Sequence, residues 1–459
     1  MPSSTPAPLP PGPKGLWFLG SALDQLRDPL GFFVRGRERF GDIVRYGMGP
    51  GGTVIQLNHP DYIKHVLVTN PQNYVKPPGT GRLLGNGLFS SRGDFWKRQR
   101  RMMQPAFHRD RIGPMVDKTV EGTRSMLARL EAQARSGKPF DAELEMTWVL
   151  RSILSLSVFS VDITEQSPTL RDALDDVMTF GRRKISIWSA IPFPRPGRRH
   201  YLKCIDVLDE GMYALLRQRL QKPAEQQDLL SSMIAARDSQ GEPMTEKQLR
   251  DEAMTLLVSG HEATVSALTW VWYLLDQHPE VERKVRDELA LVLGDAPPTA
   301  QTIQQLHYTS RVFAETLRLY PPAWVMGRIA KEEDQIGGYT IPAKTTLAFS
   351  QYIMHRHPAY WEDPERFDPE RFAPERKGTQ PRYTYFPFGG GQRQCIGENL
   401  GELQALVIMA VVLQHYRLKV EPGFPVELEA GVTLRPAKGL RVIAQPAPLA
   451  ATARRAAGA

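Results

Sequence analysis

Cysteine is scarce in this sequence, and long apolar runs are missing. Only Cys204 and Cys395 occur among 459 residues, too few for a disulfide framework or for a zinc site made of several cysteines. We therefore expect a reducing, cytoplasmic compartment. The longest uninterrupted apolar run, 405–413, is far shorter than the ~18 residues of a membrane span, and residues 1–13 lack the basic and apolar regions of a signal peptide. These absences predict a protein without a membrane span.

The sequence also has no large excess of basic over acidic residues. Lys and Arg number 58 against 50 Asp and Glu, which gives a net charge of +8 at pH 7. The densest basic cluster lies at 97–101 and has no interleaved aromatic residues or nucleic-acid motif around it. We therefore expect no nucleic-acid partner. With 41% apolar residues, the chain can bury a large core, so a disordered protein is excluded.

The chain contains neither an internal linker nor a repeat. Residues 1–13 form a Pro-rich lead, and residues 446–459 form an Ala-rich tail that we expect to be flexible. Length alone would allow roughly three domains. The continuous pattern of 14–445 instead predicts one domain.

Helical spacing of apolar residues dominates that domain. It predicts helices over 114–136, 142–160, 204–221, 245–277, 302–319 and 398–414. Residues 41–57 are β-branched and aromatic with interspersed glycines, which favours a hairpin near the start. Short strand-like pieces recur at 335–350 and 415–445. The sequence therefore predicts a mainly α fold with small peripheral β-sheets.

Chemistry concentrates in the segment 386–400, F-P-F-G-G-G-Q-R-Q-C-I-G-E-N-L, which runs into an apolar helix. Its three adjacent glycines allow positive φ and close backbone approach to a flat ligand. Cys395 stands just before the helix N-terminus, where unpaired N–H groups stabilise a thiolate. Haem iron accepts such a thiolate as an axial ligand. An inert buried thiol, a nucleophile and a member of another metal site are the alternatives.

Five residues of this segment fit the pattern F-x-x-G-x-R-x-C-x-G: Phe388, Gly391, Arg393, Cys395 and Gly397. This pattern is the haem-ligand signature of the cytochromes P-450, which the chain resembles from Pro10 to about residue 445. The resemblance implies the P-450 fold, haem b as cofactor, and Cys395 as the axial ligand of its iron. It also implies a haem-thiolate monooxygenase that uses O2 for hydroxylation or epoxidation.

The helix after the cysteine departs from the family pattern. It has Leu400-Gly401 where the family usually has an aromatic residue followed by Ala, and Gln404 where Glu is usual. These departures concern packing against the haem more than catalysis.

Glu315 and Arg318 lie three residues apart on the predicted helix 302–319, so they share one face. Alone, such a pair is usually solvated and worth little. The pair matches the E-x-x-R motif of the family, and the resemblance implies a third partner, Arg371, with Arg366 as the alternative. Their implied role is structural, as a network that holds the cysteine loop in shape.

The two propionates of a haem require cations. Trp96 and Arg100 match the W-x-x-x-R motif of the family, and Arg328 and Arg393 occupy the other positions that the resemblance assigns to propionate contacts. A guanidinium suits a carboxylate because it donates two parallel hydrogen bonds.

The predicted helix 245–277 carries a glycine and an acid amid apolar residues, Gly260 and Glu262. A helical Gly costs about 1 kcal/mol relative to Ala, and burying an unpaired acid costs more. The resemblance implies that this segment receives dioxygen and that Glu262 helps to deliver protons. Ala263 stands where the family has an alcohol that assists protonation. Thr264, a substrate hydroxyl or an ordered water could replace it; Thr264 is about 100° around the helix, which favours the other two.

The histidines near these motifs do not suggest further ligands. His261 precedes the acid, and we expect it on the far side of the helix. His355 and His357 flank an arginine but lack a third or fourth ligand nearby. We predict no metal at either place.

Apolar side chains occupy the positions that the resemblance assigns to the substrate pocket. They are Leu88, Phe89, Leu256, Val258, Ala323, Val325 and Met326. They imply a small apolar substrate of the terpenoid, fatty-acid-like or polyketide kind, although the same residues would also serve as core. The aromatic and Pro-rich segment 185–196 is either a mobile lid or an ordinary loop.

Electrons must come from another protein, because two cysteines cannot ligate an iron–sulfur cluster and no reductase-sized extension is present. We expect a ferredoxin or flavodoxin with its NAD(P)H-dependent reductase, docked on Arg92, Lys97, Arg98 and Arg101. A monomeric bacterial enzyme of secondary metabolism is the expectation. The alternatives are a haem-binding sensor or carrier without turnover, a peroxide-driven peroxygenase, and a thiol hydrolase without haem.

Overall fold

The computed structural model describes residues 7–77, 81–108, 111, 113–182, 197–221, 228–376, 378 and 380–447. The first six residues of the expected lead, the expected tail from residue 448 and the candidate lid at 185–196 lie outside these residues.

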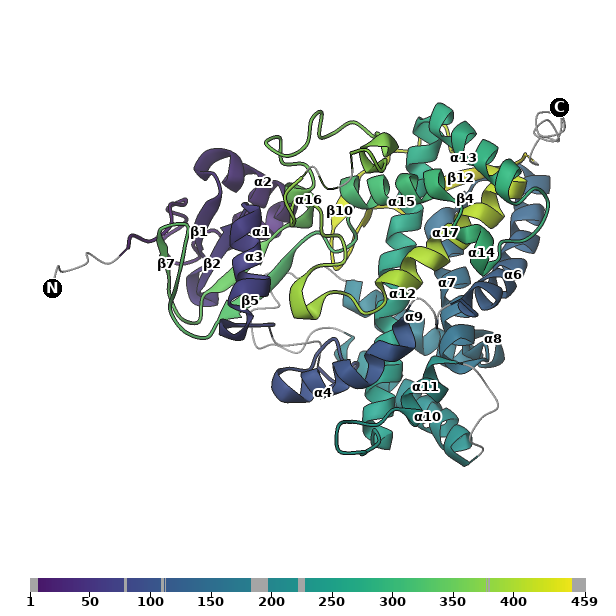
Figure 1. The fold of residues 1–459 in the computed structure, drawn as a ribbon, viewed down its shortest axis with the longest axis horizontal. Coiled ribbons are helices and arrows are strands. Elements are labelled where there is room, and N and C mark those ends of the chain that lie inside the picture. Colours follow the sequence, from purple (N-terminus) through teal and green to yellow (C-terminus); the bar gives the residue numbers. More distant parts are fainter. Residues whose placement is uncertain are drawn as a thin grey trace.

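Helices make up most of the described chain, and most of them gather around α12 (Figure 1). The α-helices are α1 (Ala22–Arg27), α2 (Pro29–Phe40), α3 (Pro60–Lys64), α4 (Gly93–Met103), α6 (Met115–Ser136), α7 (Ala142–Phe159), α8 (Ile163–Gln166), α9 (Pro168–Arg182), α10 (Arg198–Gln221), α11 (Leu229–Ala235), α12 (Glu246–Gln277), α13 (Pro279–Val292), α14 (Ala300–Ile303), α15 (His307–Leu319), α16 (Gln351–Met354) and α17 (Glu398–His415).

The strands form four small sheets. They are β1 (Ile43–Gly47), β2 (Thr53–Leu57), β3 (Tyr74–Val75), β4 (Phe140–Asp141), β5 (Met326–Ala330), β6 (Asp334–Ile336), β7 (Tyr339–Ile341), β8 (Thr346–Phe349), β9 (Tyr416–Val420), β10 (Leu428–Ala430), β11 (Leu434–Pro436) and β12 (Arg441–Pro446). The largest sheet has the order β1-β2-β8-β5-β3; the others are β4-β12-β9, β6-β7 and β10-β11.

The largest sheet lies at the end of the molecule opposite α6, α7 and α13 (Figure 1). Its antiparallel β1–β2 pair, with Ile43 opposite Leu57, confirms the predicted hairpin. Strand β5 lies between β8 and the edge strand β3 and carries Arg328 opposite Leu347 of β8. The sheet therefore fixes the position of one of the predicted cations.

The longest helix, α12, begins at the capping box that the sequence contains. The Thr245 side chain accepts from the Gln248 backbone N–H, and the Gln248 side chain accepts in return from the Thr245 N–H. Helix α17, which includes the apolar run 405–413, is buried among α6, α12, α13 and α15. The predicted mainly α fold with small sheets is confirmed. No helix in the described ranges is both long and apolar enough to cross a membrane.

Two predicted helix boundaries were wrong. The stretch 302–319 is divided between α14 and α15, because residues 304–306 leave helical geometry and bury Leu306 in the core. Helix α10 begins at Arg198, six residues before the predicted start. The amphipathic helices α2, α9 and α13 were not predicted.

Candidate functional site

The loop that carries Cys395 turns tightly before α17. Gly389 and Gly391 adopt φ of 75° and 66°, in the left-handed region that favours glycine. The Cys395 N–H donates to the Phe388 carbonyl at 2.9 Å, which closes the turn. A Cβ on Gly391 would lie 2.1 Å from the Leu67 carbonyl oxygen, so no larger residue fits there. The glycines and this hydrogen bond therefore fix the position of Cys395 in the turn.

The Cys395 side chain is accessible to solvent although protein atoms surround much of the sulfur. Burial raises the pKa of the Cys395 thiol above its ordinary value of 9.0, while the backbone N–H of Gly397 acts in the opposite direction. Burial of this kind disfavours a thiolate that has no positive partner. It suits a sulfur whose charge a bound cation stabilises.

Helix α4 and the cysteine loop hold each other through aromatic and polar contacts. Trp96 is buried, and the Arg393 guanidinium lies 4.1 Å from its ring centroid. Arg100 Nη1 donates to the Gln394 carbonyl at 2.9 Å, and Arg393 Nη2 donates to the Ser91 carbonyl at 2.8 Å. Three of the predicted haem-binding residues are thus brought together beside Cys395.

Lys76 is a further cation beside these residues, and the sequence did not predict it. Lys76 Nζ donates to the Phe89 carbonyl at 2.6 Å and lies 3.3 Å from the centroid of the Phe89 ring. Burial, with Arg393 and Arg328 nearby, lowers the pKa of Lys76 to about 7. Burial likewise lowers the pKa of Arg328 to about 10, and burial together with Arg328 lowers that of Arg393 to about 10. The signal in the sequence, an isolated lysine after a short strand, is too common to reveal this site.

These positive charges converge on one place. In the described part of the chain, no carboxylate forms an ion pair with Lys76, Arg100, Arg328 or Arg393. Grouped, partly buried cations repel one another and are stabilised by an anionic ligand. A dianion next to a thiolate ligand matches the two propionates and the iron of a haem. The residues present therefore fit this cofactor.

Helix α12 presents a line of small side chains at its centre. Ser259 and Ala263, one turn apart, are exposed although most of their neighbours on the helix are buried. Val258 is partly buried in the same apolar cluster as Ile396, the neighbour of Cys395. The exposed side chains of Ser259 and Ala263, called the accessible line below, therefore belong to the helix that packs beside the cysteine segment.

The other predicted residues of this helix are less accessible. Glu262 and Thr264 are buried. A Cβ built on Gly401 of α17 would lie 3.7 Å from Thr264 Oγ1, and one on Gly260 would lie 3.2 Å from the Leu154 side chain of α7. The Thr264 hydroxyl is thus close to α17, whereas Ala263 is on the accessible line. His261 is fully buried, with Nδ1 2.8 Å from the Leu257 carbonyl.

Glu315 and Arg318 form a fully buried ion pair. Arg318 donates from Nε and Nη2 to both Glu315 oxygens at 2.7 and 2.8 Å. Arg371 Nε lies 3.4 Å from Glu315 Oε1. The remaining Arg318 N–H groups donate to three backbone carbonyls, those of His355, Pro364 and Arg366. Arg366 contributes only its backbone to this network, so the structure brings Arg371 rather than the Arg366 side chain to Glu315.

His355 connects this network to the cysteine loop. Its carbonyl accepts from Arg318 Nη1 at 2.9 Å, and its Nε2 accepts from the Phe386 N–H at 2.9 Å. Burial, with Arg318 and Arg356 nearby, lowers the pKa of His355 to about 3, so the ring is neutral. The sequence predicted no metal here but did not show this role, because the contact spans 31 residues.

The predicted substrate-pocket residues differ in exposure. Leu88 is buried in the cluster of α10 and α12, and its N–H donates to Glu252 at 2.9 Å. Met326 approaches the cysteine loop, since a Cβ on Gly389 would lie 3.3 Å from its sulfur. Val258 and Val325 are partly buried, and Phe89 and Ala323 are exposed. The side chains thus come from three separate segments around the Cys395 loop.

The predicted docking cations are not all available to a partner. Arg98 Nε donates to Asp238 at 2.6 Å, and Lys97 Nζ donates to Asp94 at 2.9 Å. Arg101 is exposed on the same helix. The basic cluster is partly neutralised within the protein.

Known proteins share this architecture. The cytochrome P-450 family profile matches residues 10–443. Cyclooctat-9-en-7-ol 5-monooxygenase of Streptomyces melanosporofaciens is 32% identical over 420 residues, 90% of each chain. Pentalenene oxygenase of Streptomyces avermitilis is 28% identical over 94% of this chain and 96% of that protein. The solved structure of retinoic acid-bound cyanobacterial CYP120A1 gives a TM-score of 0.86 at 25% identity, covering 96% of this chain and 100% of that one. This chain belongs to the cytochrome P-450 family of haem-thiolate monooxygenases.

Proposed function

We propose that this monooxygenase holds haem b through Cys395 and oxidises a terpenoid that already carries a hydroxyl group. The observation that carries the proposal is the line of small side chains on α12, where Ala263 is accessible and offers no hydroxyl. The family and its oxygenase relatives establish the reaction type. The substrate, the role of each residue and the redox partner are the proposed parts.

Two sets of residues would hold the cofactor, one at its iron and one at its propionates. Cys395 Sγ would ligate the iron, and Arg100, Arg328 and Arg393 would bind the propionates, with Lys76 beside them. Bound haem supplies the activation of O2, from which one oxygen atom enters the substrate and the other leaves as water. Trp96 keeps Arg393 in place by stacking on its guanidinium.

Proton delivery would depend on α12 and on the substrate. Glu262 is a carboxylate on the same helix, buried within one residue of the accessible line, and would hold a proton for transfer. Ala263 lacks the group that would pass it on, and the Thr264 hydroxyl lies against α17. A substrate hydroxyl beside Ala263 would complete the path.

The name of one relative supports a hydroxylated substrate, and the name of a second supports only its hydrocarbon frame. One acts on cyclooctat-9-en-7-ol, whose name describes an unsaturated alcohol, and the other is an oxygenase of pentalenene. The apolar side chains of Leu88, Val258 and Met326 would contact the hydrocarbon part. A substrate that combines a hydrocarbon frame with one hydroxyl fits both features of the site.

A ferredoxin with its NAD(P)H-dependent reductase would supply electrons at Arg101 and Arg92, the exposed cations of this region without an ion pair among the described residues. Both cysteines are free, which suits a reducing bacterial cytoplasm.

The haem assignment is tested by the spectrum of the reduced protein with carbon monoxide. We expect the red-shifted Soret band of thiolate ligation in the wild type and its loss in Cys395→Ala. A spectrum unchanged in that variant would contradict the assignment of the ligand. Product formation with a surrogate ferredoxin system, and none with the protein alone, would separate turnover from mere haem binding.

The role of the substrate hydroxyl is tested with a terpene alcohol and its parent hydrocarbon. We expect the wild type to couple electrons to product several-fold better with the alcohol. Ala263→Thr should remove that difference by raising the coupling of the hydrocarbon, whereas Ala263→Val, of the same size but without a hydroxyl, should not. Equal coupling of the two substrates by the wild type would contradict the proposal.

A further inference from the structure

A second group of chemically reactive side chains lies away from Cys395, between α9 and α10. Asp176 comes from α9, and His200 and Cys204 come from successive turns of α10. Cys204 is buried, while the side chains of Asp176 and His200 are about half to two thirds exposed, at 51% and 67%. A thiol, an imidazole and a carboxylate thus meet at the surface, and the haem site uses none of them.

The distances within this group are close to those of a metal coordination triangle. Cys204 Sγ lies 3.5 Å from His200 Nε2 and 3.9 Å from Asp176 Oδ2, and the latter two atoms are 2.7 Å apart. Tetrahedral zinc, with bonds of about 2.0 Å to N and O and 2.3 Å to S, separates N from S and S from O by about 3.6 Å and N from O by about 3.3 Å. The exposed Asp176 and His200 side chains would move apart by about 0.6 Å, and Asp176 would approach the Cys204 sulfur by about 0.3 Å, on this geometry.

We propose that Asp176, His200 and Cys204 bind one divalent transition metal ion of the zinc type, with water as the fourth ligand. The donor set of one thiolate, one imidazole and one carboxylate is borderline-soft, which favours Zn²⁺ over Ca²⁺ or Mg²⁺. On binding, the Cys204 thiol gives its proton to solvent and its sulfur forms the bond to the metal. No electron is transferred.

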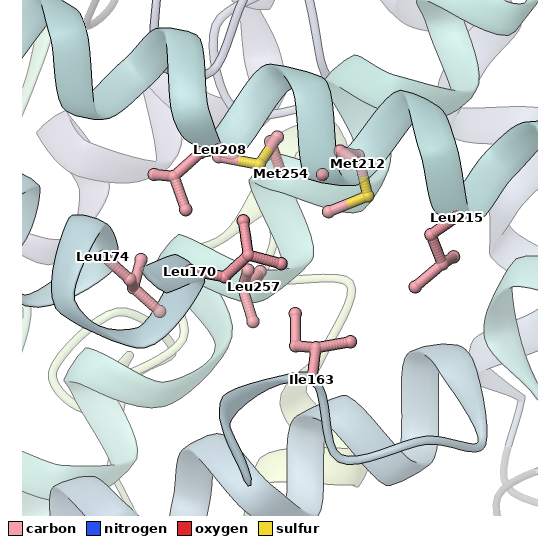
Figure 2. A pocket seen from close by; sticks show the side chains of 9 residues that line it. Ile163, Leu170, Leu174, Leu208, Met212, Leu215, Met254 and Leu257 are labelled. Carbon is pink, nitrogen blue, oxygen red and sulfur yellow. The ribbon is translucent and has the colours of Figure 1, made fainter. Parts of the chain in front are cut away.

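The position of this site suggests what the metal does. A small apolar cavity of about 20 Å³ lies between α8, α9, α10 and α12 (Figure 2). Leu174 of α9 and Leu208 of α10 line it, two residues before Asp176 and four after Cys204. A metal bound by both helices would therefore connect two walls of this cavity, whose lining also includes Met254 and Leu257 of α12. It would hold α9 against α10 and restrain any widening of the cavity.

The test titrates the haem-loaded protein with ZnCl2 and measures bound zinc after dialysis. We expect one zinc per wild-type chain, and binding at least about 100-fold weaker in Asp176→Asn and His200→Ala, since even outer partners of metal ligands contribute 10- to 100-fold. Both side chains are exposed, so these variants should fold. Asp172→Asn is the matched control, because Asp172 lies one turn away on α9 and pairs with Arg171; it should bind zinc like the wild type.

A second measurement follows the thiol itself. With Cys395 bound to the haem, Cys204 is the remaining cysteine of the chain. Zinc should slow its alkylation by iodoacetamide at least tenfold in the wild type and in Asp172→Asn, but not in His200→Ala. Zinc that binds equally to all variants, fails to bind, or leaves alkylation unchanged would overturn the proposal. None of these outcomes depends on monooxygenase activity, so the proposed function is tested separately.

Discussion

Glu252 should make the stability of this protein depend on pH. The side chain is fully buried on α12, where Oε2 accepts from the Leu88 N–H at 2.9 Å and Oε1 accepts from Gln99 Nε2 at 3.3 Å. Burial, assisted by Asp251, raises the pKa of Glu252 from 4.5 to about 7. Between these values the folded protein binds more protons than the unfolded chain. The free energy of unfolding therefore falls as the pH rises through this window.

The magnitude follows from the two pKa values. A shift from 4.5 to about 7 corresponds to about 3 kcal/mol of destabilisation at pH 8 and about 1 kcal/mol at pH 5. Glu252→Gln removes the ionisation. Its amide oxygen can still accept from the Leu88 N–H. Its NH2 group can donate to Gln99 after that side chain rotates, because Gln99 Oε1 has no hydrogen-bond partner in the described structure.

The assay is equilibrium urea unfolding of the wild type and Glu252→Gln at pH 5 and pH 8. We expect the stability advantage of the variant to grow by about 2 kcal/mol from pH 5 to pH 8, while any constant effect of the amide cancels in the difference. Glu246→Gln, on the first turn of the same helix where the side chain is partly exposed, is the control and should show no such growth. An advantage of Glu252→Gln that is the same at both pH values would refute the reasoning.

Two further predictions concern the support of the cysteine loop. Arg318→Lys puts one ammonium in place of a guanidinium that donates to a carboxylate and three carbonyls. The free energy of unfolding, measured in urea, should therefore fall by about 3–5 kcal/mol. A fall below 1 kcal/mol would contradict the role of this network. Gly391→Ala places a Cβ 2.1 Å from the Leu67 oxygen at φ of 66°, so purified protein should retain much less haem, measured by absorbance. Gly401→Ala, where the nearest atom is 3.7 Å away, should retain wild-type haem, and equal retention by both variants would show that the clash is relieved.

The parts of the fold with local signals could be predicted from the sequence. The capping box before α12, the glycine-separated hairpin of β1 and β2 and the buried run in α17 each depend on residues within a few positions of one another. The Cys395 loop belongs to this group, because its glycines and the following helix start are local. The division of α14 from α15 could not be predicted, since burial of Leu306 by distant helices decides it.

The residues of the site that were missed are joined by tertiary packing. Lys76 reaches Arg328 and Arg393 across more than 250 residues, and the imidazole of His355 reaches Phe386 across a gap in sequence. Neither contact leaves a pattern in the order of residues. The sequence also could not show that Arg98 is paired with Asp238, which removes one of the cations expected to meet a redox partner.

The Cys395 side and the α12 side of the proposed haem site are built differently. We expect the first to determine cofactor binding, which the family shares, and the second to determine the substrate specificity of this protein. On the Cys395 side, the glycine turn, the buried Arg318 and the neutral His355 each hold the loop, so we expect one substitution there to disturb cofactor binding for any substrate. On the α12 side, Ser259 and Ala263 are small and accessible. Because small side chains impose few contacts, a substrate bound as we propose would fill that side, and its functional groups would become part of the catalytic apparatus. Specificity should therefore respond to changes on α12 that leave the haem spectrum unchanged.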